Sequence, residues 1–280
     1  MNTKLNNEIE MPLIGIGTFM LTPDEAEESV YNALQNGYRL IDTANAYVNE
    51  KGVGRGIKKS GLPREEVFLE TKLWPTLYED ESAVDKTLER LDVDYIDLML
   101  LHQPAGNYIN GYKLLEKAYK EGKIKALGLS NFSEKQINEI LDMCEVKLTI
   151  IQVESHPYYP QDKLREFLSD YNIKLQAWFP LGHGDKTLIE QPIFEELSKK
   201  YNKSKVQIIL RWHIQIGNIV IPGAKSKEHI IDNINIFDFE LTDEEMNEIK
   251  KLDKNVPYVT HEEDEMDRYL NWHPDIEGQK

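Results

Sequence analysis

Cysteine is almost absent from this sequence, because Cys144 is the single one among 280 residues. One cysteine excludes a disulfide within the chain and every zinc site that needs several cysteine ligands. The sequence also lacks the basic start and apolar core of a signal peptide, and no apolar run approaches the ~20 residues that a membrane span requires. We therefore expect a soluble cytoplasmic protein.

Positive charge is scarce as well. Lys and Arg number 33 against 49 Asp and Glu, which gives a net charge of −16. Such an acidic surface repels nucleic acids and anionic membranes, so we expect neither as a partner. Any phosphate-bearing ligand must then find a local basic pocket. The hydrophobic content of 40% is enough for a full core, and disorder is not expected.

The chain has no linker rich in Ser, Gly or Pro, so residues 1–280 are predicted to form a single domain. Short apolar or β-branched runs alternate with amphipathic helical patterns. The runs that we read as strands are 13–17, 38–42, 67–71, 95–102, 124–130, 149–154, 173–178 and 218–223. Eight such units of about 30 residues predict an α/β fold, a (β/α)8 TIM barrel, with a doubly wound sheet as the alternative. The acidic, aromatic tail over 255–280 gives no clear pattern.

A glycine run, "KGVGRG" over 51–56, invites comparison with a dinucleotide-binding fingerprint. Its spacing is Gly-x-Gly-x-Gly, and it follows a loop rather than a strand. We therefore interpret it as a helix packed closely against the rest of the barrel.

Polar residues gather where the predicted strands end. The second strand ends on Asp42, Lys72 follows the third, His102 ends the fourth, Ser130 and Asn131 end the fifth, Gln152 and Glu154 lie in the sixth, and Trp178 ends the seventh. In (β/α)8 barrels the chemistry lies at the C-terminal ends of the strands. Each of these residues has an ordinary structural explanation when taken alone, so we base the functional interpretation on all of them together.

Three residues of this set, Asp42, Lys72 and His102, together with Tyr47 from the loop after the second strand, suit one reaction. A phenol has a pKa near ~10, and a neighbouring ammonium such as Lys72 lowers it. Asp42 can keep that lysine charged in a partly dry pocket. A neutral His102 can orient a carbonyl oxygen while Tyr47 protonates it.

The sequence resembles the aldo-keto reductases over nearly its whole length. The motifs that carry the resemblance, in family order, are "GIGTF" (15–19), "DTANAYVNEKGVGRGI", "ETKLW", "LERLDVDYIDLMLLHQP", "GKIKALGLSNF" and "VESHPYYP". The resemblance implies a (β/α)8 barrel and NAD(P)H-dependent reduction of carbonyls. It also implies that Tyr47 is the general acid, that Lys72 adjusts its pKa, that Asp42 pairs with Lys72, and that His102 orients the substrate.

The same resemblance implies the cofactor contacts. They are Gly17, Thr18, Phe19, Asp42, Ser130, Asn131, Gln152, Trp178, Phe179, Leu181, Ile221, Lys225, Ser226, His229 and Asn233. The main departure is "IPGAKSKEHIIDN" (221–233), where Gly223, Ala224 and His229 replace the Lys, Ser and Arg that commonly bind the 2′-phosphate of NADPH. Because Lys does not reproduce the planar fork of Arg, we expect a weakened preference for NADPH that leaves NADH usable.

The resemblance leaves the substrate open. The predicted substrate contacts are Phe19, Tyr47, Trp74, His102 and Tyr108, with Met20, Val48 and the tail around Tyr269 and Trp272 as further walls. This apolar and aromatic lining favours small aldehydes, α-keto carbonyls or diketones. A monomer is the family default.

Two other functions were weighed. A non-catalytic cofactor-binding or regulatory barrel is the alternative, because a fold does not fix a function. A metal-dependent hydrolase would use Asp42, His102, Glu154 and His156. These four lack a tight ligand spacing, and Tyr47 and Lys72 would have no role in that chemistry, so we expect no metal.

Overall fold

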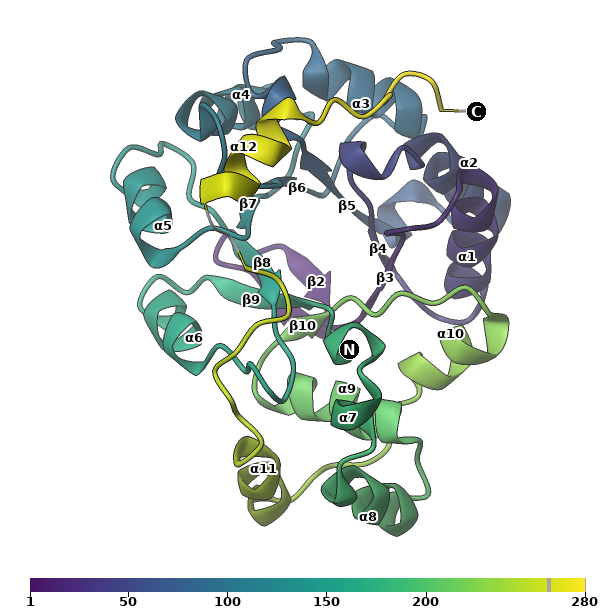
Figure 1. Cartoon of the computed structure of the whole chain (residues 1–280). Coiled ribbons are helices and arrows are strands. Elements are labelled where there is room, and N and C mark those ends of the chain that lie inside the picture. Colours follow the sequence, from purple (N-terminus) through teal and green to yellow (C-terminus); the bar gives the residue numbers. More distant parts are fainter. Residues whose placement is uncertain (261–262, 280) are drawn as a thin grey trace.

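The computed structural model describes residues 1–260 and 263–279, and within them eight parallel strands form a barrel (Figure 1). The strands are β3 (Gly15–Gly17), β4 (Leu40–Asp42), β5 (Phe68–Leu73), β6 (Leu98–Leu101), β7 (Leu127–Ser130), β8 (Ile150–Glu154), β9 (Lys174–Trp178) and β10 (Ile219–Val220). Each pairs with the next in chain order, and parallel bridges from Ile14 to Val220 and from Gly17 to Gly223 join the last strand to the first. The predicted barrel is confirmed, and the doubly wound alternative is wrong.

Helices surround the barrel. The α-helices are α1 (Pro23–Gln35), α2 (Glu50–Ser60), α3 (Ala83–Leu91), α4 (Tyr108–Lys120), α5 (Glu134–Leu141), α6 (Asp162–Ser169), α7 (Lys186–Ile189), α8 (Pro192–Tyr201), α9 (Lys205–Gln215), α10 (Lys227–Ile234), α11 (Asp243–Lys250) and α12 (Glu263–Asn271). The first begins with a capping box, in which the hydroxyl of Thr22 accepts a hydrogen bond from the amide of Glu25 and the amide of Thr22 donates one to the carboxylate of Glu25.

The glycine run in α2 is a packing device, as interpreted from the sequence. A Cβ atom added to Gly52 would lie 2.0 Å from the carbonyl oxygen of Pro23, and one added to Gly54 would lie 2.2 Å from that of Leu91. Only glycine permits so close an approach of α2 to the start of α1 and the end of α3. This packing fixes the start of α2, directly after the loop that carries Tyr47.

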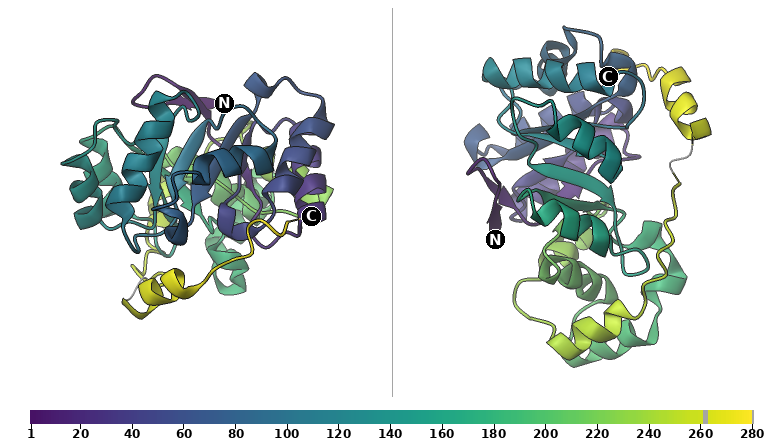
Figure 2. Two further views of the ribbon diagram at one scale, coloured as in Figure 1. Left: turned by 90° about the horizontal axis from the view of Figure 1, so that it is seen from above. Right: turned by 90° about the vertical axis from the view of Figure 1, so that its left-hand side faces the viewer.

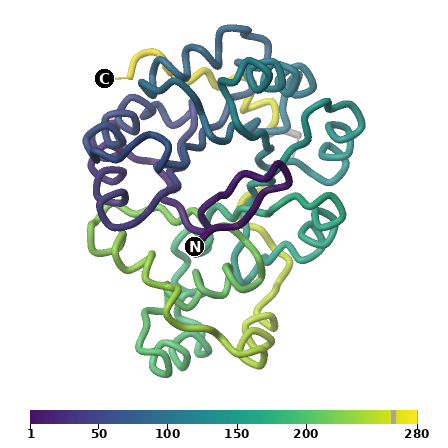
Figure 3. Tube along the Cα trace, turned by 180° about the vertical axis from the view of Figure 1, so that it is seen from behind, coloured from purple at the N-terminus to yellow at the C-terminus, as the bar shows by residue number. Residues whose placement is uncertain are grey.

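The two ends of the barrel are covered differently. A short hairpin, β1 (Asn2–Lys4) with β2 (Glu10–Pro12), lies at one end, and α12 lies at the opposite end (Figures 2 and 3). The hairpin contributes Leu5 and Met11 to an apolar cluster with Leu40, Leu98 and Ile150 of the strands. The sequence analysis did not predict this hairpin. Its effect is to fill one end of the barrel and leave the C-terminal ends of the strands for the site.

Candidate active site

A cavity of about 1030 Å³ opens at the C-terminal ends of the strands, beneath α12. Most of the residues singled out in the sequence line it: Gly17, Phe19, Met20, Asp42, Tyr47, Trp74, His102, Ser130, Asn131, Gln152, Trp178, Phe179, Leu181, Ile221, Gly223, Ala224, Lys225, Ser226, His229, Tyr269 and Trp272. They come from all eight barrel strands or the loops that follow them and from the tail. One continuous cavity therefore joins the predicted catalytic residues to the predicted cofactor residues.

At the floor of this cavity, Lys72 links Asp42 to Tyr47. Its Nζ atom lies 2.5 Å from Oδ2 of Asp42, 3.0 Å from the carbonyl oxygen of Thr43 and 3.3 Å from the phenol oxygen of Tyr47. Asp42 and Lys72 are fully buried, and Tyr47 is half-buried. Burial lowers the pKa of Lys72, but the charges of Asp42, Tyr47 and Glu70 raise it more, so the lysine stays charged.

His102 stands across from Tyr47, with 5.7 Å between the ring centres and the rings nearly perpendicular. Burial, with the charge of Lys72 as a second cause, holds the pKa of His102 well below its usual 6.5. The imidazole is therefore neutral at neutral pH. Its buried Nδ1 has no hydrogen-bond partner among the described residues, which favours the tautomer that carries its proton on Nε2.

The acidity of Tyr47 differs from the sequence-based expectation. Burial raises the pKa of the phenol more than the ammonium of Lys72 lowers it, and Asp42 and Glu70 add to the rise, which brings the pKa to about 12. Lys72 thus acts in the expected direction, but the net shift is upward. The cause is desolvation of the phenolate, which a one-dimensional motif does not reveal.

Glu70 is a residue of the site that the sequence analysis missed. It is fully buried in β5, in register with Asp42, and its carboxyl group receives hydrogen bonds from Gln152 (2.7 Å) and Gln176 (2.8 Å). Burial, and after it the neighbouring charge of Asp42, raise the pKa of the Glu70 carboxyl group well above the usual value. An acid inside the apolar run "VFLET" was the available signal.

The middle of the cavity is formed by amide and indole groups from β7, β8 and β9. The indole nitrogen of Trp178 donates to Oδ1 of Asn131 at 2.8 Å, and the amide nitrogen of Asn131 donates to Gln103 at 3.2 Å. The amide nitrogen of Gln152 lies 3.0 Å from Oδ2 of Asp42. These contacts connect the cavity wall directly to the Asp42–Lys72 pair.

The far end of the cavity is more open. Lys225 is largely exposed and pairs with Glu25 at 3.2 Å. Ser226 caps α10 by accepting a hydrogen bond from the amide of His229 at 3.2 Å. Gly223 has open space around it, since a Cβ atom there would meet nothing nearer than the carbonyl oxygen of Gly17 at 3.8 Å. Cationic and hydroxyl groups thus gather here, without an arginine.

Five residues predicted from the sequence are not among those that line the cavity: Thr18, Val48, Lys72, Tyr108 and Asn233. Lys72 is fully buried beside Asp42 and Tyr47. Thr18 is buried and donates its hydroxyl to the carbonyl oxygen of Asp42 at 3.0 Å, and Asn233 is buried within α10. Tyr108, predicted to contact substrate, begins α4, donates to Glu139 and packs edge-on against Phe132. The path of the loop after β6 carries Tyr108 outward, so we do not retain it as a substrate contact.

Other residues line the cavity although the sequence analysis gave them no such role. They are Leu21, Ala46, Gln103, Pro180, His183, Pro222, Val259 and Arg268. Most belong to loops next to a predicted residue, where spacing alone does not tell which side chain faces inward.

The acids and histidines of the hydrolase alternative are placed differently. Glu154 and His156 contact each other at 2.9 Å, and the carboxylate of Glu154 also accepts the amides of Tyr258 and Val259. Over residues 1–260 and 263–279, no group of three or more His, Cys, Asp or Glu side chains is arranged to hold a metal. The same residues include no helix long and apolar enough to cross a membrane.

Comparison with known proteins follows this geometry. Residues 13–254 match the model of the Aldo/keto reductase family. A glyoxal reductase of Bacillus subtilis is 45% identical over 260 residues, which cover 90% of this chain and 92% of that protein. A methylglyoxal reductase of Escherichia coli is 36% identical over 255 residues, with 90% and 93% covered.

Solved structures agree. An aldo/keto reductase from Brucella melitensis superposes with a TM-score of 0.87 at 40% identity, covering 90% of this chain and 99% of that one. An aldo-keto reductase from a deep-sea metagenome library gives a TM-score of 0.90 at 39% identity, covering 93% and 97%.

Proposed function

Because the chain belongs to the aldo/keto reductase family, whose reaction is the reduction of aldehyde and ketone carbonyls to alcohols, we propose that it does so with NAD(P)H and with Tyr47 as the general acid. The observation that carries this proposal is the position of Lys72, whose ammonium lies 2.5 Å from Asp42 and 3.3 Å from the phenol of Tyr47. A phenol beside a buried, charged ammonium suits proton donation to an oxygen that gains negative charge.

The cavity suits an extended dinucleotide. Its residues divide into an end rich in amide and hydroxyl groups (Ser130, Asn131, Gln152), an aromatic wall (Trp178, Phe179) and an end with basic side chains (Lys225, His229). We assign the amides to the carboxamide of the nicotinamide, Trp178 to its ring, and Gly17, Phe19, Leu181 and Ile221 to the stretch between. Lys225, Ser226 and His229 would receive the adenosine end. The cofactor, when bound, supplies the hydride.

The chain's own residues handle the proton and the carbonyl. The substrate oxygen lies between the phenol of Tyr47 and the neutral ring of His102, which donates from Nε2 and fixes its direction. As the carbonyl carbon accepts the hydride, the O–H bond of Tyr47 breaks and its proton passes to the carbonyl oxygen, giving the alcohol. The phenolate left behind faces the ammonium of Lys72, and Asp42 keeps that ammonium in place.

The substitution Tyr47→Phe tests the assignment. We expect a loss of about 10³-fold or more in the reduction rate, because the proton donor is removed, while cofactor binding, followed by quenching of tryptophan fluorescence, is retained. Reduction that continues at more than about a tenth of the wild-type rate would show that another group is the acid.

The relatives suggest which carbonyls to try. Glyoxal and methylglyoxal are the compounds in the names of two of them, and a cavity walled by Phe19 and Trp74 beside Tyr47 suits small aldehydes and dicarbonyls. We therefore propose 2-oxoaldehydes as substrates and NADPH as the cofactor, with NADH usable. We also propose that the protein is a cytoplasmic monomer of one domain, because one chain supplies every residue of the site.

Assays with both cofactors test the cofactor choice. A KM for NADPH that is a thousandfold below the KM for NADH would contradict a weakened preference, which rests on Gly223, Ala224 and His229.

A further inference from the structure

The tail around α12 forms part of the cavity wall. Arg268, Tyr269 and Trp272 line the cavity. Trp74 connects this wall to the catalytic floor, because its buried indole packs edge-on against Trp272 (4.9 Å between ring centres) on one side and against His102 (5.1 Å) on another. The indole nitrogen of Trp74 also donates to the carbonyl oxygen of Trp272 at 3.1 Å.

On the near side of α12, the tail is attached to the barrel by Glu154. Its two carboxylate oxygens accept the amides of Tyr258 at 2.6 Å and Val259 at 3.0 Å. Glu154 ends β8, so this attachment is as rigid as the barrel itself.

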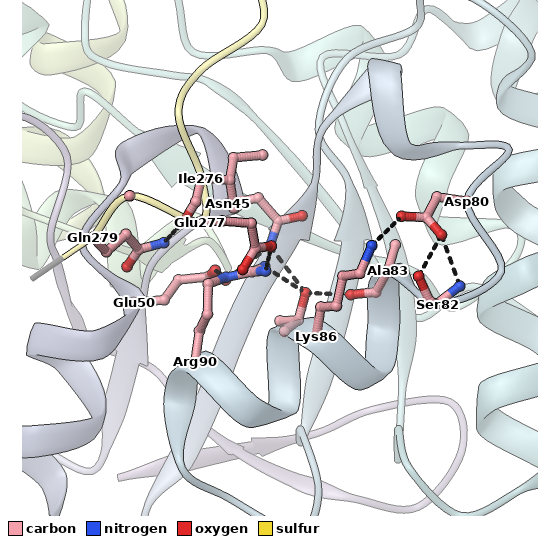
Figure 4. Close-up of polar contacts among 12 residues, drawn as sticks. Asn45, Glu50, Asp80, Ser82, Ala83, Lys86, Arg90, Ile276, Glu277 and Gln279 are labelled. Atoms are coloured by element: carbon pink, nitrogen blue, oxygen red, sulfur yellow. Dashed lines mark hydrogen bonds and ion pairs between the residues drawn. The ribbon is translucent and has the colours of Figure 1, made fainter.

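On the far side of α12, the tail is attached at a place remote from the cavity. Glu277 accepts a hydrogen bond from Nη1 of Arg90 in α3 at 2.7 Å, as Figure 4 shows. The side-chain oxygen of Gln279 accepts a hydrogen bond from the main-chain amide of Lys51 at 3.0 Å. The main-chain carbonyl oxygen of Gln279 accepts one from the ammonium of Lys51 at 2.8 Å. Ile276 is buried between these two contacts. We call the pairs Arg90–Glu277 and Lys51–Gln279 the clasp.

Arg90, one of the residues of the clasp, is itself held in place by a buried carboxylate. Arg90 is 5% exposed, and its Nε donates at 2.7 Å to Glu50, which is fully buried. Glu50 also accepts from Asn45 at 2.8 Å and from Thr71 at 2.9 Å (Figure 4 shows Arg90, Glu50 and Asn45). Asn45 begins the short helix that ends on Tyr47, and Thr71 precedes Lys72. The same buried carboxylate therefore holds the catalytic segments and the arginine that receives the tail.

From these contacts we infer that Arg90 and Glu277, with Lys51 and Gln279, are positioning residues that hold the tail wall over the cavity and thereby set the affinity for carbonyls large enough to reach Tyr269 and Trp272. The inference rests on the proposed carbonyl reductase function. A small substrate that contacts only Tyr47 and His102 does not depend on the wall. A substrate with a bulky group does, because a loosened wall loses the packing contacts with that group.

The test compares methylglyoxal with phenylglyoxal, which differ only in methyl against phenyl beside the same dicarbonyl. In Glu277→Ala the charge-assisted hydrogen bond to Arg90 is lost, and we expect the KM for phenylglyoxal to rise about 5- to 10-fold. The kcat values for both substrates and the KM for methylglyoxal should stay within about twofold. Glu277→Gln keeps an acceptor for Arg90 and should restore most of the affinity.

Two further variants add an independent probe of the clasp and a control. Gln279→Ala removes the side-chain acceptor of the Lys51 amide without touching an ion pair, while the contact of the Lys51 ammonium with the main-chain carbonyl oxygen of residue 279 remains, and it should raise the same KM. Glu81→Ala removes a comparably exposed acid, paired with Lys117 at 3.1 Å, and should change nothing. The variants at 277 and 279 leave the buried Arg90–Glu50 pair intact, so folding is preserved.

Hydrogen exchange supplies a readout besides activity. The amides of residues 265–272 should exchange faster in Glu277→Ala and Gln279→Ala than in the wild type, while those of β5 and β6 should not change. If the wild type reduces both substrates and the two variants match it in KM, the clasp has no positioning role. If the wild type reduces neither substrate with either cofactor, the proposed function itself fails and the clasp inference fails with it.

Discussion

The two ends of the cavity differ in how far their charged side chains are buried and in how many hydrogen bonds these side chains make. At the catalytic end, Asp42 and Lys72 are withdrawn from solvent and each makes several hydrogen bonds. At the adenosine end, Lys225 is largely exposed, and its one ion pair is with the partly exposed Glu25. A buried ion pair tolerates no loss of one partner, whereas an exposed pair contributes little and is easily replaced. Under the proposed function, the chemistry is therefore fixed by the fold, and the cofactor choice is left adjustable.

Removal of the lysine at the catalytic end should have the largest effect. In Lys72→Met, Asp42 is left as a buried carboxylate without its cation, which should lower the free energy of unfolding by about 3–5 kcal/mol in urea titrations. The reduction rate should fall by about 10³-fold or more, because the phenolate of Tyr47 loses its stabilising charge.

The control for that variant is Lys58→Met, which breaks an exposed pair with Asp92 at 3.0 Å and should cost at most about 1 kcal/mol. Equal stabilities for the two variants would remove the contrast between buried and exposed pairs.

A gain of function should be available at the adenosine end. The double variant Gly223→Lys with His229→Arg places two cationic donors where the family commonly has them, and Gly223 has room for a side chain. We expect the KM for NADPH to fall about tenfold or more, because charge-assisted hydrogen bonds to a phosphate form, while the KM for NADH stays unchanged. An equal fall for both cofactors would show that the new side chains act on something other than the 2′-phosphate.

The sequence predicted the parts of the fold that repeat. Alternating strand and helix patterns predicted the barrel, which the structure confirms. The polar residues at strand ends predicted a set of side chains that the structure brings together at one cavity. The hairpin of β1 and β2 was missed, since each strand has three residues and shows no usable alternation. The outward path of Tyr108 was missed because a loop's course depends on its packing against α5, which lies later in the chain.

Electrostatic consequences were the hardest to predict. The order of residues showed that Lys72 lies near Tyr47, but not how dry the phenol is, and dryness decides the net shift of its pKa. The place of Glu70 in the site likewise depends on its burial and on contacts with Gln152 and Gln176 from other strands. The sequence predicts which residues of known motifs lie close together. It does not predict how deeply they are buried, because the burial depends on side chains from three different strands.

A smaller effect should follow from Lys225→Ala. The side chain is exposed and already paired with Glu25, so its contribution to a bound phosphate is screened. We expect a rise of about two- to threefold in the KM for NADPH at physiological salt, and no change in kcat or in the KM for NADH. A rise of tenfold or more would mean that Lys225 has taken over the role of the missing family cations.

The smallest expected effect is that of pH on the catalytic end. The pKa of His102 is held well below 6.5 and that of Tyr47 is raised to about 12, so neither group changes its protonation near neutrality. Acid should therefore abolish carbonyl orientation only well below the usual histidine range, as His102 gains a proton, and alkali should remove the proton donor only as the pH approaches the pKa of Tyr47. We expect kcat/KM for methylglyoxal reduction to vary less than about twofold between about pH 6.5 and 9, measured at saturating cofactor. A fall in kcat/KM with a midpoint near pH 7 or 8 would show that a less buried group titrates in the rate-determining step. The contrast between a buried catalytic end and an exposed adenosine end would then no longer hold.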